Sequence, residues 1–236
     1  MRDYSLAKKL ILFYLLTFVL SFCSIVYELI LAQSLTAFLE NTVLRYSVVI
    51  GLYMCSMGFG ALATEGSFVQ NPLRGLVYIE ILLSVFGGFS VIFLYLLDFL
   101  NLTRIIFEIS AYGLIIIVGV LTGFELPLFI EILCSNQEQR EHTILGINYA
   151  GALTGSILFA FVFYPIAGLI PTAFFLGLLN IFCGMVLFLQ EDKPLHKSRS
   201  GIDGIWAALI ILLVLFAVCW LCSGWISNFF INLYLK

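Results

Sequence analysis

The chain has 236 residues, of which 62% are hydrophobic and 11% charged, and its mean hydropathy is +1.12. A soluble domain carries about 25% charged residues, so this composition excludes a soluble enzyme, a disordered chain and a nucleic-acid binder. The net charge of −3 is too small to indicate an ionic partner, and the composition predicts an integral membrane protein surrounded by a lipid bilayer.

Seven stretches are long and apolar enough to cross a hydrocarbon core of about 30 Å as helices. Each must satisfy its backbone hydrogen bonds internally, so the expected fold class is an all-α, polytopic membrane helix bundle. The expected spans are 10–34, 44–63, 76–99, 103–134, 145–164, 168–190 and 205–223. We expect a six-helix unit over 1–190, a cytoplasmic loop over 191–204, and a seventh helix with an interfacial tail over 205–236.

The basic residues lie unevenly on the two sides of these spans. Only Arg45, Arg104 and Lys236 fall on one side. The other side carries Arg2, Lys8, Lys9, Arg74, Arg140, Lys193, Lys197 and Arg199. The positive-inside rule therefore predicts a multi-pass protein of the bacterial cytoplasmic membrane, with its amino terminus in the cytoplasm and its carboxyl terminus outside.

The first three spans and the next three share features in the same order. Glu28 follows an aromatic residue and precedes a leucine, as does Glu125, and each half has a Gly-rich middle span. The run that starts at Leu82 resembles the run that starts at Leu178. Three spans per half would make the halves enter the bilayer from opposite sides, which is a 3+3 inverted repeat. Chance similarity among Leu- and Phe-rich helices is the alternative.

An ionisable group inside a span is costly, so Glu125 is the most informative residue of the fourth span. Pro127 cannot donate a hydrogen bond to the carbonyl of Gly123, which predicts a helix break between them. The freed carbonyl and the carboxylate would form a cation or proton site. The alternative is a carboxylate among lipid headgroups, because Glu125 lies about 31 Å along the helix from Arg104.

Other polar residues are expected on the same inner side as Glu125. They are Glu65, Glu80, Asn148 and Tyr149, and together they could line an inner vestibule that binds a substrate or ion. On the outer side we expect a structural ion pair between Glu28 and Arg45.

Three further features have structural interpretations. Arg104 and Glu108 have the i, i+4 spacing of a local pair. Asn180 is interpreted as an interhelical hydrogen-bonding residue. Cys219 and Cys222 form a C-x-x-C pair without an accompanying histidine, which is weak evidence for redox or metal chemistry. We therefore expect no metal site and no cofactor.

Several motifs in order resemble the membrane domain of bacterial membrane-bound spermidine synthase-like proteins. They are Cys23-Ser24-Ile25-Val26-Tyr27-Glu28-Leu29, Ser56-Met57-Gly58-Phe59-Gly60, Gly123-Phe124-Glu125-Leu126-Pro127 and Asn148-Tyr149-Ala150-Gly151-Ala152. The resemblance covers about 10–190 and implies a transporter-like six-helix unit. In that family a soluble aminopropyltransferase domain follows, whereas here only 191–204 precedes the seventh span, so the expectation is that aminopropyl transfer does not carry over.

The expected function is therefore that of a subunit or anchor in a membrane complex, with another membrane or cytoplasmic chain or a second copy as its partner. The alternative is a stand-alone carrier that moves a polyamine or another small cation past the inner carboxylates. A membrane-embedded enzyme is the least expected class, because the sequence has no H-E-x-x-H or G-x-S-x-G motif.

Overall fold

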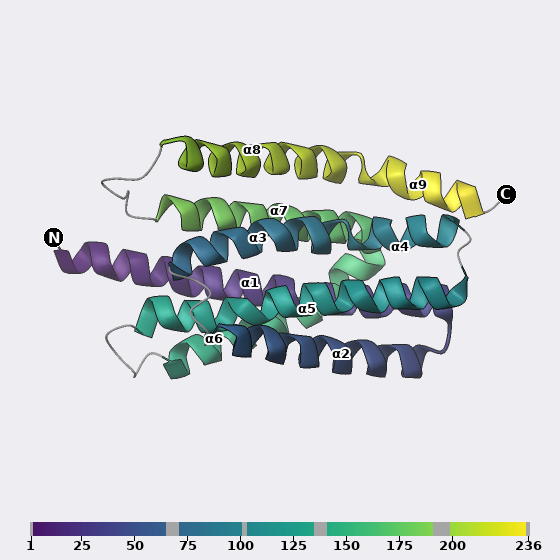
Figure 1. The fold of residues 1–236 in the computed structure, drawn as a ribbon, viewed down its shortest axis with the longest axis horizontal. Helices are drawn as coiled ribbons and strands as arrows, with labels where there is room; N and C mark the ends of the chain where they lie inside the picture. The colour runs from purple at the N-terminus through teal and green to yellow at the C-terminus, as the bar shows by residue number, and fades with distance from the viewer. Residues whose placement is uncertain (1, 65–70, 101–102, 135–140, 191–198, 235–236) are drawn as a thin grey trace.

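The structure is a computed structural model that describes residues 2–64, 71–100, 103–134, 141–190 and 199–234. Within these ranges the regular elements are all helical and none is a strand, which confirms the all-α prediction. The helices lie side by side with their long axes roughly parallel (Figure 1). Seven stretches of them are long and apolar enough to cross a membrane, as many as the sequence predicts.

The helices follow one another with short connections. Their bounds are α1 (Arg2–Leu39), α2 (Thr42–Ala63), α3 (Pro72–Gly88), α4 (Ser90–Phe99), α5 (Arg104–Cys134), α6 (Glu141–Leu158), the π-helical segment η2 (Phe159–Ala167), α7 (Leu169–Leu189), α8 (Arg199–Leu221) and α9 (Ser223–Tyr234). The third apolar stretch joins α3 to α4, and the fifth joins α6 to η2.

Local sequence explains where the helices begin and end. Glu40 and Asn41 have φ values of 59° and 56°, and this left-handed pair reverses the chain between α1 and α2. At the start of α3 the Asn71 side chain accepts a hydrogen bond from the Leu73 amide at 3.2 Å, and Pro72 occupies the first helical position.

Glycines set the closest helix contacts. A Cβ at Gly123 of α5 would lie 2.2 Å from the Met57 carbonyl oxygen of α2, and a Cβ at Gly60 would lie 2.2 Å from the Val120 carbonyl oxygen. The α6 helix packs on α1 in the same way, since a Cβ at Gly151 would lie 2.4 Å from the Phe18 carbonyl oxygen. Small residues thus allow backbone-to-backbone packing at these positions, whereas Gly51 and Gly58 of α2 meet nothing within 4 Å.

The third close pairing is between α3 and α7, and α8 packs on the outside of this pair. The ring of Phe216 from α8 fills the space above Gly88 and Gly177, where added Cβ atoms would lie 2.4 Å and 2.5 Å from it. Phe216 is fully buried, whereas Val214 and Leu221 of the same helix are mostly exposed. The α8 helix is therefore attached to the bundle by one face.

The predicted helix break at Gly123–Pro127 is not observed, because α5 runs unbroken from Arg104 to Cys134. A proline removes only one backbone donor from the helix, and the neighbouring i→i−4 bonds can remain. The tight contact of Gly123 with Met57 also holds this part of α5 against α2. Glu125 therefore lies on a continuous helix and not at a helix end.

Candidate functional site

Two carboxylates from different helices lie inside the bundle. Glu80 of α3 is 0% exposed and Glu125 of α5 is 6% exposed, and the two are close enough to act on each other electrostatically. Glu80 lies about 12 Å from the start of α3, and Glu125 lies about 14 Å from the end of α5. These helices are antiparallel neighbours, so the two residues reach the same level from the same end of the bundle.

Side chains of α1 and α7 complete the surroundings of these two residues. Cys23 and Tyr27 of α1 and Cys183 of α7 are all buried and lie within electrostatic range of both carboxylates. We call Glu80, Glu125, Cys23, Tyr27 and Cys183 the acidic centre. Residues of four helices meet there although they are far apart in the sequence.

Glycines make room for the acidic centre. A Cβ at Gly184 of α7 would lie 3.2 Å from the Cβ of Glu80, so the side chain of Glu80 lies directly against the α7 backbone. A Cβ at Gly87 of α3 would lie 2.7 Å from the ring of Tyr27. Both Glu80 and Tyr27 therefore occupy positions that a larger residue on the facing helix would fill.

Several buried polar atoms of this region have no hydrogen-bond partner. They include both carboxylate oxygens of Glu80, the Tyr27 hydroxyl and both amide atoms of Asn180. Asn180 is fully buried one helical turn from Gly184, on the same face of α7. The sequence predicts that Asn180 bonds a neighbouring helix, but neither amide atom has a hydrogen-bond partner.

The unpartnered, fully buried carboxylate of Glu80, with Glu125 in electrostatic range, indicates that a positive charge or a proton belongs at the acidic centre. An ionised carboxylate in an apolar interior costs several kcal/mol unless it is paired. Among the described residues, no basic side chain acts on Glu80 or Glu125. The described residues also contain no group of three or more His, Cys, Asp or Glu side chains that could hold a metal ion.

The structure brings together only part of the predicted inner vestibule. Glu80 and Glu125 are neighbours, whereas Glu65 lies outside the described residues. The backbone carbonyl of Asn148 accepts a hydrogen bond from Ser21 Oγ at 2.6 Å, so this residue ties α6 to α1. Tyr149 is 69% exposed and points away from the bundle, because it lies on the face of α6 opposite the packed Gly151 and Gly155.

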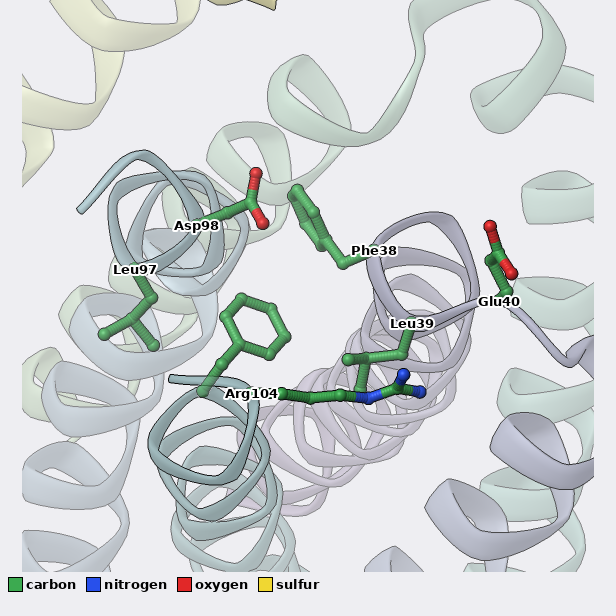
Figure 2. A pocket seen from close by; sticks show the side chains of 7 residues that line it. Phe38, Leu39, Glu40, Leu97, Asp98 and Arg104 are labelled. Carbon is green, nitrogen blue, oxygen red and sulfur yellow. The ribbon is translucent and has the colours of Figure 1, made fainter. Parts of the chain in front are cut away.

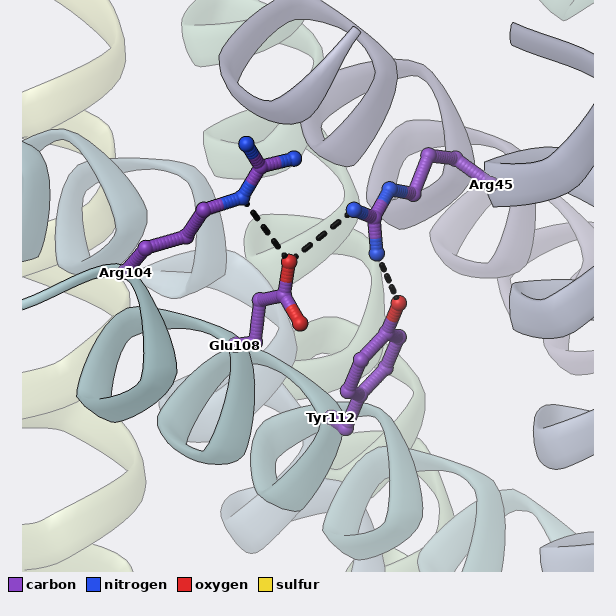
Figure 3. A network of polar contacts seen from close by, with 4 residues as sticks. All are labelled: Arg45, Arg104, Glu108 and Tyr112. Atoms are coloured by element: carbon purple, nitrogen blue, oxygen red, sulfur yellow. Dashed lines mark hydrogen bonds and ion pairs between the residues drawn. The ribbon is translucent and has the colours of Figure 1, made fainter. Parts of the chain in front are cut away.

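The ion pair of Arg45 differs from the prediction. Arg45 pairs with Glu108 of α5 at 2.9 Å and donates to the Tyr112 hydroxyl at 2.5 Å, whereas the sequence predicts a pair with Glu28 (Figure 3). The α1 helix continues to Leu39, five residues beyond the expected end of the first span. Because Tyr46 bonds Gln33, Arg45 lies level with Gln33, and Glu28 lies about 8 Å away along the axis.

The predicted local pair of Arg104 with Glu108 is confirmed, at 3.3 Å. Glu108 therefore accepts from two arginines, one of its own helix and one of α2 (Figure 3). The pairing of Arg45 with Glu108 was also open to prediction from the sequence, because both residues lie near the starts of spans on the same, predicted outer side of the membrane. The choice between Glu28 and Glu108 depends on how the helices pack.

A surface pocket of about 360 Å³ lies at this same end of the bundle. Its lining residues are Phe38, Leu39, Glu40, Leu97, Asp98, Arg104 and Phe107. In Figure 2 Phe38 lies between the carboxylates of Asp98 and Glu40. The sequence did not predict this pocket. Its residues come from the end of α1, the end of α4 and the start of α5, which only the fold brings together.

The C-x-x-C pair lies at the periphery. Cys222 is exposed and Cys219 is half-buried, and both are free thiols. By contrast, sequence reasoning missed Cys23 and Cys183 of the acidic centre, because isolated cysteines in apolar helices are ordinarily small packing residues.

The chain is similar to several proteins named polyamine aminopropyltransferase. The one from Leptospira interrogans is 32% identical over 204 residues, which cover 86% of this chain and 40% of that protein. The one from Oceanobacillus iheyensis is 30% identical over 79% of this chain and 38% of its own length. Polyamine aminopropyltransferase 2 of Aquifex aeolicus is 33% identical over 80% of this chain and 37% of its own length.

These similarities establish a spermidine synthase-like relationship over most of the chain, and the chain spans about two fifths of the relatives' length. No protein-family model matches the chain, and no solved structure matches it. The relatives carry the name of an enzyme, which contradicts the expectation of a non-enzymatic subunit, anchor or carrier. The spermidine synthase-like relationship is confirmed, whereas the expected non-enzymatic function was wrong, because it was inferred from the shortness of the segment between the sixth and seventh spans.

Proposed function

We propose that the chain functions in aminopropyl transfer to polyamines, as the helical part of a polyamine aminopropyltransferase. The observation that carries this proposal is the 30–34% identity to enzymes of that name over most of the chain. The similarity runs through the helices that build the acidic centre, since it covers up to 86% of the chain. The described helices are thus a working part of such an enzyme.

The same proposal places this helical part in the bacterial cytoplasmic membrane, with the amino terminus in the cytoplasm and the carboxyl terminus outside. Two observations support it. Basic residues are concentrated on one side of the apolar stretches. Large apolar side chains also face outward, such as Ile105, Phe161 and Ile166, which are 71%, 76% and 78% exposed. Apolar surface of this extent is unstable in water, so lipid chains would be its partner.

We also propose that the first six spans form an inverted repeat of two three-span halves. The packing supports it: α2 of the first half packs on α5, the first helix of the second half, and α6 of the second half packs on α1. In both pairs a glycine of one helix touches a backbone carbonyl of the other. The third spans of the two halves, α3 and α7, pack on each other, as a two-fold relation requires.

Deletion of the gene from the organism tests the enzymatic role. Membranes and soluble fractions of deleted and complemented strains would be assayed for transfer of a radiolabelled aminopropyl group to a polyamine. We expect the deletion to abolish or strongly reduce transfer in the membrane fraction, and a plasmid copy to restore it. If the deleted strain and the complemented strain transfer the aminopropyl group equally well, in the membrane fraction as in the soluble fraction, the proposal is contradicted.

A further inference from the structure

We propose that the acidic centre is a binding site for an organic ammonium group of the kind that a polyamine carries. This inference rests on the proposed function for the class of its ligand. The site itself rests on geometry: Glu80 of α3 is fully buried with neither carboxylate oxygen hydrogen-bonded, and Glu125 is also buried on α5, which packs on α3. A cation would neutralise charge that the bundle otherwise leaves uncompensated.

The unpartnered atoms match the chemistry of an ammonium group. A primary ammonium donates three hydrogen bonds and accepts none. Both oxygens of Glu80 are buried and lack a donor, and the buried carboxylate of Glu125 on the neighbouring α5 would supply a further acceptor. Hydrogen bonds between charged groups are stronger than neutral ones, so each bond would contribute to selectivity for a charged amine over a neutral one.

The surroundings favour an amine over a metal ion. The described residues contain no set of three or more metal-ligating side chains close enough to hold a metal. The hydroxyl of Tyr27 lies within electrostatic range of both carboxylates and has no hydrogen-bond partner, so its oxygen is a further acceptor for an ammonium group. The amide oxygen of Asn180 is a further unpartnered acceptor on the same face of α7, one turn before Gly184.

Equilibrium dialysis of tritiated spermidine against the full chain in detergent tests this site, with no aminopropyl donor present. We expect saturable binding to the wild-type chain, and roughly tenfold or greater weakening in Glu80→Gln and Glu125→Gln. Glu131→Gln is the matched control, because Glu131 is an exposed carboxylate on α5, and it should bind as the wild type does. Equal binding by all four proteins, or none by the wild type, would overturn the proposal.

A second measurement on the wild-type chain does not depend on how the variants fold. A hydrophobic carbodiimide modifies buried carboxyl groups, and mass spectrometry locates the modified residues. Spermidine should slow modification of Glu80 and Glu125, whereas sodium chloride at the same ionic strength should not. Equal modification with and without spermidine would show that a proton alone neutralises the centre, which overturns the proposal. Neither experiment involves aminopropyl transfer, so this inference and the enzymatic role can fail separately.

Discussion

Arg45 of α2 pairs with Glu108 of the adjacent helix α5 at 2.9 Å, so the carboxylate of one helix neutralises a buried arginine of its neighbour. Tyr112, one turn further along α5, accepts a second hydrogen bond from the same guanidinium. Arg104 contacts the same carboxylate from an exposed position. The buried arginine therefore depends on Glu108 more than the exposed one does.

Replacement of Glu108 by glutamine should destabilise the protein. The change leaves the Arg45 charge without an ionic partner, and we expect a loss of about 1–3 kcal/mol in the free energy of unfolding. Thermal or denaturant unfolding in detergent would measure it. Arg104→Gln is the control and should cost less than about 1 kcal/mol, because Arg104 is exposed. Equal losses for the two variants would contradict this assignment.

Alanine at Gly60 or Gly123 should weaken the α2–α5 interface. The added methyl group would overlap a backbone carbonyl of the facing helix, and overpacking of this kind costs about 1–3 kcal/mol. Gly58 is the matched control on α2, since a Cβ there meets nothing within 4 Å. We expect Gly58→Ala to be neutral or to raise stability by less than about 1 kcal/mol in the same unfolding experiment. A similar loss at Gly58 would contradict the assignment of the effect to close packing at Gly60 and Gly123, because alanine favours a helix more than glycine does.

Removal of the Phe216 ring should loosen α8. Phe216→Ala leaves a void above Gly88 and Gly177, and we expect a loss of about 3 kcal/mol or more in unfolding free energy. Protease cleavage before α8 should also become faster. Val214→Ala lies on the exposed face of the same helix and should leave both measurements unchanged. An unchanged Phe216→Ala protein would mean that α8 is held by other contacts.

Labelling of single cysteines can test the proposed orientation. In a cysteine-free background, Glu40→Cys lies between α1 and α2 and Asn71→Cys lies just before α3. A membrane-impermeant maleimide added to intact cells should label Glu40→Cys but not Asn71→Cys, because the two positions are expected on opposite sides of the membrane. Asn71→Cys should react once the membrane is permeabilised. Labelling of Asn71→Cys but not Glu40→Cys in intact cells would show that the orientation is opposite to the proposed one.

The sequence was sufficient to predict the helical fold and the number of apolar stretches, because both follow from composition and length. It also predicted the Arg104–Glu108 pair, since residues four apart on one helix are neighbours whatever the rest of the chain does. Glu80 and Glu125 were identified as unusual for the same local reason, namely the cost of a carboxylate in an apolar helix.

Tertiary structure alone decided which of these residues meet. Helix register placed Glu108, and not Glu28, opposite Arg45, and a difference of about 8 Å along an axis cannot be read from hydropathy. Packing between α3, α5 and α7 brought Glu80, Glu125 and Cys183 together, with Gly184 providing the space. It also placed Tyr149 at the surface, away from the acidic centre. Periodicity assigns residues to helices, but contacts between helices depend on side-chain volumes, which only the packed bundle resolves.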